Sequence, residues 1–312
     1  MQWMAAVSLA NSDHCWVTSL TTLLGPVARE EIRRELKGFE AFSACAMSRI
    51  VETFLRLNKA DEVAFPAHYL LTTSLYAEGQ LEALYDAPRP DRPVVLRSLN
   101  PHHHAAILAR RGTLWPVRVV WIIDDIARDW RPRRDSRRDL QALEASALVR
   151  RRYATRMPEA RLTRVLDLYR RLYIRRYSRH NPDYTADYLQ HCLETGVLEI
   201  LTLERDGDIV AFCAIHGRGG VLSAPMVGYD EAIDGLYRLI MALPALEAEA
   251  RGLMLNLSAG AAHFKRHRGA RPHVEYLMIL DDHLPPGRRL PFGLVGALLQ
   301  ALEPKLIKAA TQ

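Results

Sequence analysis

The sequence predicts an α/β protein built from two halves, each a mixed sheet with flanking helices. The first observation is that the second half alternates segments of strand and helix periodicity in the order α-α-β-β-β-α-β-α-β. The second is a shorter pattern of the same kind, strand, helix, strand, late in the first half. With 312 residues, 49% of them apolar, the chain can bury two modest cores or one large one.

Composition narrows the class of protein. No run approaches eighteen uncharged apolar residues, and the short apolar stretch at the start has no basic segment before it. We therefore expect a cytoplasmic protein without a membrane partner, and its oligomeric state stays open. The four cysteines lie far apart without a C-x-x-C pair, which argues against a zinc ribbon or a disulfide framework.

The net charge of +6 is unevenly distributed. The segment from Arg128 to Arg179 contains seventeen arginines, no lysine and six carboxylates, so the rest of the chain is net acidic. Because arginine makes bidentate contacts with phosphate, this segment could bind RNA, a nucleotide or a phosphopantetheine cofactor. A solvated, charged helix surface explains the same arginines equally well.

Residues 157–312 are expected to form the second domain. Two helices begin it, one with apolar residues at helical spacing from Leu162 to Tyr177 and one from Thr185 to Gly196. Three strands with clear turn signals follow as a meander: 197–203, 208–215 and 221–227. The remaining elements alternate between helix and strand: helix 234–250, strand 253–257, helix 259–268 and strand 274–280.

Residues 1–127 are expected to form the first domain. Its recognisable part is a strand over 93–99, a helix over 101–110 and a strand over 117–123, with Asn100 as a suitable helix cap. Residues 128–156, polar and rich in arginine, are predicted to be a linker between the two domains.

The most informative segment runs from Ser258 to Gly269. It follows an apolar strand and combines small residues with cations, which predicts a turn where a ligand approaches the backbone at the start of a helix. Ser258 and Gly260 would line this turn, and Lys265 and Arg266 would add positive charge. This pattern predicts a site for an anionic or carbonyl-bearing group.

Three polar side chains are predicted to lie on strands near such a site. Glu275 shares a strand face with apolar residues, where desolvation would raise the pKa of its carboxyl toward the range of a general base; a structural glutamate paired with an arginine is the alternative. Arg97 lies between apolar residues and needs an anionic partner there. Asn256 could hold an extended, peptide-like arm or satisfy a neighbouring backbone group.

The element order of the second half resembles the GNAT acyltransferase superfamily, most closely its branch with two GNAT-like halves, which includes the Fem-type aminoacyltransferases. The resemblance covers about residues 157–283 and rests on three motifs, Met226–Asp230, Gly235–Arg238 and Phe264–Gly269. It implies a degenerate GNAT-like first domain and a catalytic GNAT-like second domain. It also implies that Lys265, in the Phe-Lys-x-x-x-Gly element, polarises the donor carbonyl or holds a phosphate.

The end of the third meander strand supplies two further candidates. Tyr229 could donate a proton to a leaving group, and Asp230 could bind the acceptor amine or cap the following helix. Acetyl-CoA-dependent members of the superfamily carry a glycine-rich loop here, whose N–H groups bind the pyrophosphate. This sequence has one early glycine, Gly228, and three acidic residues before Gly235, so the acyl-CoA pose or the donor itself differs.

We therefore expect an N-acyltransferase that moves an acyl group from an activated donor to an amine of a small molecule or amino acid. Acyl-CoA is the expected donor because it is the common one in the superfamily. The alternatives are an aminoacyl-tRNA-dependent Fem-like aminoacyltransferase and a non-catalytic GNAT-like binding module. Lys265 and backbone N–H groups would stabilise the oxyanion, and Glu275 would take the amine proton. No metal or redox cofactor is expected.

Overall fold

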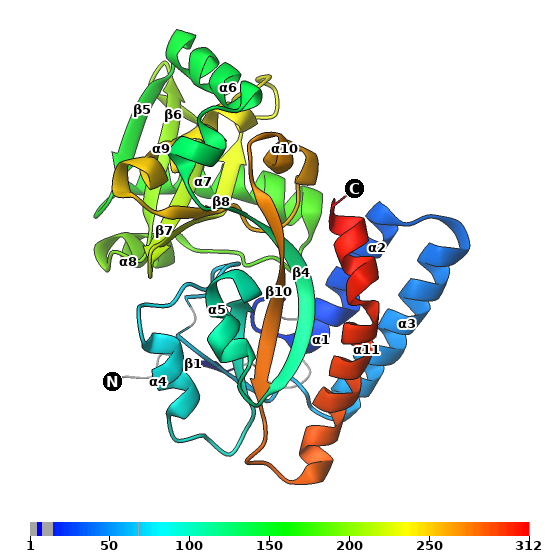
Figure 1. Ribbon diagram of the computed structural model, residues 1–312. Helices are drawn as coiled ribbons and strands as arrows, with labels where there is room; N and C mark the ends of the chain where they lie inside the picture. Colours follow the sequence, from blue (N-terminus) through cyan, green and yellow to red (C-terminus); the bar gives the residue numbers. More distant parts are fainter. Residues whose placement is uncertain (1–4, 8–14, 68, 312) are drawn as a thin grey trace. The chain divides into compact units, whose positions relative to one another are not determined.

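The computed structural model (Figure 1) describes residues 5–7, 15–67 and 69–311. These residues divide into two compact units, each assembled from separate stretches of the chain. Unit 1 takes in residues 1–119, 178–182 and 273–312. Unit 2 takes in residues 120–177 and 183–272.

Unit 1 contains a small mixed set of strands. β1 (Ala5–Val7) pairs antiparallel with β2 (Ala64–Pro66), and β2 pairs parallel with β3 (Val94–Leu99). β3 then pairs antiparallel with β10 (Arg271–Leu280). The helical segments of this unit are α1 (Leu20–Thr22), the π-helix η1 (Leu23–Val27), α2 (Ala28–Glu35), α3 (Gly38–Leu57), α4 (Gln80–Asp86), α5 (Pro101–Leu108) and α11 (Pro286–Thr311).

The alternation of side chains along β3 is interrupted at Ser98. Val95 and Leu99 were expected on one strand face with Arg97 between them, but they pack into different apolar clusters. The reason is that Ser98 has a φ of 57°, and the pairing of β3 with β10 shifts by one residue at this point. Such a bulge moves the following side chain to the other face of the sheet.

Unit 2 is built around an antiparallel meander of the strands β6 (Glu199–Arg205), β7 (Asp208–Arg218) and β8 (Val221–Tyr229), which confirms the predicted one. β5 (Val149–Tyr153) pairs antiparallel with β6 at one edge. On the other side β8 pairs parallel with β9 (Met254–Asn256), and β9 pairs antiparallel with β4 (Thr113–Ile123).

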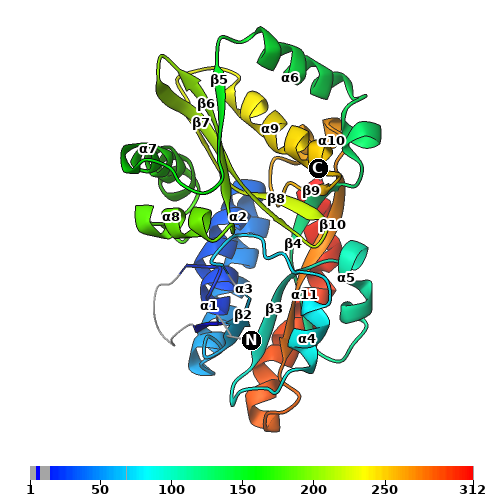
Figure 2. The same cartoon turned by 90° about the vertical axis from the view of Figure 1, so that its left-hand side faces the viewer.

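The helices of unit 2 lie on both faces of this meander. Figure 2 shows α7 and α8 on one face and α9 on the other. The interior between α9 and the strands is an apolar cluster that includes Ile240, Leu255 and Cys213. The helical segments are η2 (Ile126–Trp130), α6 (Arg134–Ala145), α7 (Glu159–Tyr169), η3 (Arg170–Tyr177), α8 (Ala186–Glu194), α9 (Leu236–Arg251) and α10 (Ala262–His267).

The predicted fold class holds in part. An α/β fold with a mixed sheet and flanking helices is confirmed. Two separate GNAT-like domains are not shown, because the unit boundaries fall inside β4 and β10, so each of these strands runs from one unit into the other. The proposed domain limits 1–127 and 157–312 therefore stay a prediction from the sequence.

The segment expected to be an Arg-rich linker, residues 128–156, contains helix α6 and strand β5. Its polar composition has a physical reason. β5 is an edge strand with exposed side chains, and its arginines form ion pairs with the neighbouring strand, Arg151 with Glu204 and Arg152 with Glu199. An edge strand of this kind lacks the apolar alternation by which strands are recognised.

Gly269 closes the turn between α10 and β10 at a point of close backbone approach. Its φ is 84°, and a Cβ atom placed there would lie 2.0 Å from the carbonyl oxygen of Asp129. We expect Gly269→Ala to lower the free energy of unfolding by about 3 kcal/mol or more, since strain and a backbone clash add together. Urea denaturation of both variants measures this.

Gly207 is the matched control for this substitution. It has a φ of 86°, but a Cβ atom there meets nothing within 4 Å. Gly207→Ala is therefore expected to cost only about 1 kcal/mol, the strain of the left-handed conformation alone. Equal losses in the two variants would contradict the close approach at Gly269.

Candidate active site

The candidate site of unit 2 lies where two neighbouring strands stop pairing. β8 and β9 pair only from Val221–Met254 to Ser223–Asn256. β9 then ends at Asn256, whereas β8 continues to Tyr229. Beyond Ser223 the edge of β8 is no longer paired with β9, and the chain leaves β9 in a turn.

The turn after β9 has an unusual backbone. Ser258, Gly260 and Ala261 all have positive φ, at 60°, 76° and 50°. Only glycine adopts this conformation without strain, so the two other residues cost free energy that the surroundings must supply. Strained turns of this kind persist where neighbouring groups hold them, and they concentrate at functional sites.

Two buried side chains hold this turn from beneath. The amide oxygen of Asn256 accepts a hydrogen bond of 2.8 Å from the N–H of Ser258. The ammonium group of Lys265 donates to the carbonyl oxygens of Ser258, at 3.1 Å, and of Ala259, at 2.7 Å. Lys265 is only 3% exposed. Both side chains therefore form hydrogen bonds with backbone groups of the turn. For Asn256 this is one of the two predicted roles. For Lys265 it is a structural role, in place of the predicted contact with the donor.

Helix α10 is shorter than expected. It begins at Ala262 and has six residues, so Ser258 and Gly260 lie in the turn before the helix and not in its first turn. Arg266 is exposed, and its guanidinium lies 5.8 Å from the ring centroid of Trp121. Of the two predicted cations, Arg266 faces solvent and Lys265 is buried.

Five aromatic residues gather beside the end of β8, and we refer to them as the tyrosine cluster: Tyr173, Tyr177, Tyr229, Tyr237 and Phe264. The ring centroids of Tyr229 and Tyr237 are 5.7 Å apart, and those of Tyr237 and Phe264 are 4.8 Å apart. Tyr173 and Tyr177 of η3 lie 5.9 Å from each other. The contacts of Tyr237 link β8, α9 and α10 through aromatic rings, whose tilted packing stabilises such pairs.

The hydroxyl groups of Tyr173, Tyr229 and Tyr237 stay protonated. Burial is the main cause that raises the pKa of Tyr229, and it also raises the pKa of Tyr173 and Tyr237. For Tyr173 the neighbouring hydroxyls of Tyr237 and Tyr177 add to this effect. A protonated phenol at the end of a strand can donate a hydrogen bond or a proton, which is the chemistry predicted for Tyr229.

Asp230 forms hydrogen bonds within the loop that follows β8. Its Oδ1 accepts a hydrogen bond of 3.1 Å from the N–H of Ala232, and its Oδ2 lies 3.7 Å from the guanidinium of Arg164. Its N–H donates to the carbonyl of Val210 at 2.8 Å. The side chain thus organises the loop before α9, as a capping residue would, and is partly neutralised by an arginine.

Gly228 has a packing role. A Cβ atom there would lie 2.5 Å from the ring of Phe212 and 2.9 Å from the backbone of Leu168 and of Tyr169. The absence of a side chain therefore lets the end of α7 approach β8 closely. This explains the single early glycine of the loop without a ligand.

Two predicted residues, Arg97 and Glu275, belong to unit 1. Glu275 is buried, and its Oε1 accepts a hydrogen bond of 2.6 Å from Nε of Arg118. Its Oε2 is buried and has no hydrogen-bond partner among the described residues. The ion pair with Arg118 is the structural alternative given above for Glu275. Its Oε2 remains available as a hydrogen-bond acceptor.

Arg97 is buried against an aromatic ring. Its guanidinium lies 5.3 Å from the ring centroid of Trp16, and Arg118 lies 5.4 Å from the same centroid. Burial, and after it the positive charge of Arg118, lower the pKa of Arg97 to about 10, and the carboxylate of Glu275 opposes both effects. Glu275 is thus the anionic group that compensates this arginine in unit 1.

Arg268 contributes to unit 2 in a way that the sequence did not suggest. It is buried, its Nε donates to Asp139 at 2.6 Å, and its guanidinium lies 3.6 Å from the ring centroid of Phe264. It therefore fixes α10 to α6. The i, i+4 spacing of Phe264 and Arg268 on a helix is the signal that could have indicated this pair.

The family comparison bears on unit 2. Residues 131–266 match the model of the acetyltransferase (GNAT) domain. The chain therefore carries a GNAT acyltransferase domain, as the resemblance implied, and the matched residues include the tyrosine cluster and most of the turn and helix around Lys265. None of the curated proteins matches the sequence significantly.

Solved structures share the fold at low sequence identity. L-PGS from Bacillus licheniformis is 15% identical, with a TM-score of 0.51 over 75% of this chain and 82% of that one. The C-terminal domain of a protein designated a lysylphosphatidylglycerol synthetase, from Agrobacterium fabrum, is 14% identical, with a TM-score of 0.50 over 77% of this chain and 80% of that one. These similarities describe a common fold.

Substitution of Lys265 separates its structural role from a catalytic one. Lys265→Met removes the donor to two carbonyl groups, so the free energy of unfolding is expected to fall by about 1–3 kcal/mol in urea denaturation. The exposed neighbour Arg266→Met, the control, is expected to change it by less than about 0.5 kcal/mol. A Lys265→Met protein as stable as the parent, yet inactive, would contradict the structural role and favour direct action on the donor.

Proposed function

We propose that the chain is an aminoacyltransferase that takes its acyl group from aminoacyl-tRNA and passes it to an amine of a small molecule or amino acid. The observation that supports this donor is the loop between β8 and α9. In acetyl-CoA-dependent members of the superfamily, free N–H groups at this position bind the pyrophosphate. Here three N–H groups of the loop, those of Asp230, Ala232 and Ile233, already form hydrogen bonds within the protein.

Three successive observations describe the loop. The N–H of Asp230 donates to Val210, the N–H of Ala232 donates to the Asp230 carboxylate, and the N–H of Ile233 donates to the Asp230 carbonyl at 3.1 Å. Glu231 forms an ion pair with Arg176, and Asp230 lies beside Arg164. A pyrophosphate would have to displace these bonds and approach carboxylates, which opposes binding of a CoA donor there.

The arginines of unit 2 favour a polyanionic donor. More than half of those between Arg128 and Arg179 form ion pairs with carboxylates. Among the described residues 128–177 of unit 2, five exposed arginines form no ion pair and no side-chain hydrogen bond: Arg134, Arg137, Arg150, Arg156 and Arg175. Exposed guanidinium groups without an acidic partner are available for the phosphates of an RNA backbone.

The proposed reaction requires few groups from the protein. The acceptor nitrogen forms a bond to the ester carbonyl carbon, and the bond from that carbon to the tRNA ribose oxygen breaks. The leaving oxygen takes up a proton, and the proton that the amine loses replaces it on the group that donated it. Tyr229, which has a protonated hydroxyl at the end of β8, is the proposed proton donor to this leaving oxygen.

The rings of the tyrosine cluster offer stacking partners for the terminal base of the tRNA. The Agrobacterium protein is designated a lysylphosphatidylglycerol synthetase. This name combines a lysyl group with a lipid, so the fold is compatible with aminoacyl transfer.

The donor is tested by titrating the full-length protein with charged tRNA, uncharged tRNA and acetyl-CoA, and by following acyl release. We expect saturable binding of charged tRNA that weakens steeply with salt, and no saturable binding of acetyl-CoA. Acyl transfer from acetyl-CoA, without any effect of charged tRNA, would contradict the proposed donor. Absence of binding to all three ligands at low salt would favour a non-catalytic binding module.

Substitution of two of the five exposed arginines tests whether they bind the RNA backbone. Arg134→Ala combined with Arg137→Ala is expected to weaken binding of charged tRNA and to reduce the slope of log K against log salt by about two. Arg171→Ala is the matched control, because Arg171 is already paired with Asp167 at 2.7 Å. A salt dependence that is unchanged in the double variant would place the RNA elsewhere.

A further inference from the structure

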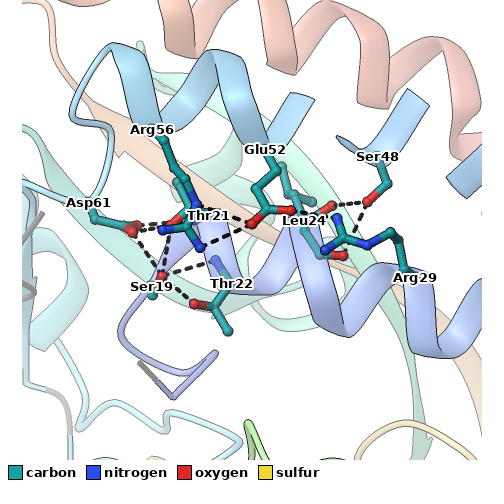
Figure 3. A network of polar contacts seen from close by, with 10 residues as sticks. Ser19, Thr21, Thr22, Leu24, Arg29, Ser48, Glu52, Arg56 and Asp61 are labelled. Carbon is teal, nitrogen blue, oxygen red and sulfur yellow. Dashed lines mark hydrogen bonds and ion pairs between the residues drawn. The ribbon is translucent and has the colours of Figure 1, made fainter. Parts of the chain in front are cut away.

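Helix α3 of unit 1 turns two polar side chains, Ser48 and Glu52, toward the interior. The hydroxyl of Ser48 donates to the carbonyl of Leu24 at 2.7 Å, and Glu52 accepts hydrogen bonds from Arg29, at 2.5 Å, and from Arg56, at 3.1 Å (Figure 3). Ser48 is buried, and the Glu52 side chain is only 16% exposed. The inner face of this helix is thus held by a satisfied polar network as well as by apolar packing of Leu55.

The outer face of the same helix is apolar. Phe39 is 81% exposed, Phe42 is 71%, Ile50 is 63% and Leu57 is 79%. At 100° per residue these four positions fall on one side of the helix, with Ala46 and Thr53 between them. A shallow groove beside Arg49 and Phe54 lies in this face. A surface helix normally shows the opposite arrangement, so this face indicates a binding partner.

Helix α11 adjoins this face with apolar residues of its own. α3 and α11 pack on the same apolar cluster and lie side by side in Figure 1. Leu290 is 58% exposed and Leu294 is 53% exposed. Among the described residues, α11 is also the helix that is long and apolar enough to cross a membrane by length and composition alone, and 22% of that window is buried.

The exposed charges around this face are mostly positive. Lys37, Arg49 and Lys59 are exposed at the ends and along one edge of α3. The acids near them are Glu40, which is exposed, and Glu62, which lies 3.8 Å from Lys59. On α11 the cations are Arg288, Arg289, Lys305 and Lys308. Glu303, the acid of α11, accepts a hydrogen bond from Tyr276. The apolar face is thus bordered by an excess of cations.

We propose that the outer face of α3, together with the adjoining part of α11, docks onto the surface of an anionic lipid bilayer. The phenylalanines enter the boundary between headgroups and acyl chains, and the bordering lysines and arginines meet the lipid phosphates. A second copy of this chain fits less well, because a symmetric contact of this face would bring like charges together. This inference concerns unit 1 alone and does not depend on the proposed donor. It goes beyond the expectation, drawn from the sequence, that the protein has no membrane partner.

The experiment is flotation of the full-length protein with vesicles of phosphatidylcholine, either pure or containing about one third phosphatidylserine. We expect binding to the anionic vesicles that is at least about tenfold tighter than to the neutral ones and that weakens with salt. Phe39→Ser combined with Phe42→Ser is expected to weaken binding to anionic vesicles at least about tenfold. Arg49→Glu combined with Lys59→Glu is expected to weaken it and to reduce its salt dependence.

Val149→Ser is the matched control, since Val149 of β5 is an exposed apolar residue, at 51%, in unit 2. It should bind anionic vesicles like the parent protein. Because both phenylalanines are exposed, the double variant should keep the circular dichroism spectrum and unfolding midpoint of the parent. A parent protein that does not float, or a double variant that floats equally well, overturns the proposal. So does a dimer in analytical ultracentrifugation that dissociates in the double variant while neither protein binds vesicles.

Discussion

The candidate site depends on the early end of one parallel strand pair. β8 and β9 share only three paired positions, and everything beyond them must be stabilised by other means. Backbone N–H and C=O groups that leave a ladder need new partners when they are buried. The β8 side is covered by aromatic rings, and the β9 side folds into a strained turn. The position of the site is therefore a consequence of where this ladder stops.

The strained turn explains why a lysine and an asparagine lie beneath it. The carbonyl oxygens of Ser258 and Ala259 both accept hydrogen bonds from Lys265, and that of Ser258 accepts another from the N–H of Trp121 at 3.1 Å. Lys265 supplies both hydrogen bonds from one ammonium group, and Asn256 supports the next backbone group. Gly269 and Arg268 then fix the end of the same segment to η2 and α6. The Phe-Lys-x-x-x-Gly element is thus held in place by packing and hydrogen bonds, and it supports the turn that precedes it.

The sequence predicted most of unit 2 because its elements have strong local signals. The meander has alternating apolar residues and glycine turns, and the GNAT resemblance followed from its order. What failed had no local signal. β5 is an exposed edge strand of arginines, and its pairing with Glu199 and Glu204 depends on residues fifty positions away. The bulge at Ser98 is likewise a backbone event that alternation cannot reveal.

The candidate residues show the same limit at the level of side chains. Glu275 was predicted to be desolvated from its place on the strand, and it is buried, whereas Lys265 was predicted to face the donor and is buried as well. Their partners could not be predicted, because Arg118 lies 157 positions from Glu275 along the chain. A residue type and its burial indicate which chemistry is available, whereas the hydrogen bonds already formed decide how much of it remains free. Tyr229 keeps a protonated, half-buried hydroxyl, so it is the stronger candidate for direct chemistry.

Charge asymmetry in the sequence is partly cancelled in the folded chain. The arginines of 128–179 are paired largely with acids from outside that segment, including Glu199, Glu204 and Glu249. An arginine whose charge is already compensated gains little from a phosphate, because the new contact must replace an existing one. Only the arginines left without acidic partners can add steeply salt-dependent binding. The functional meaning of a basic segment therefore rests on the few cations that the fold leaves uncompensated.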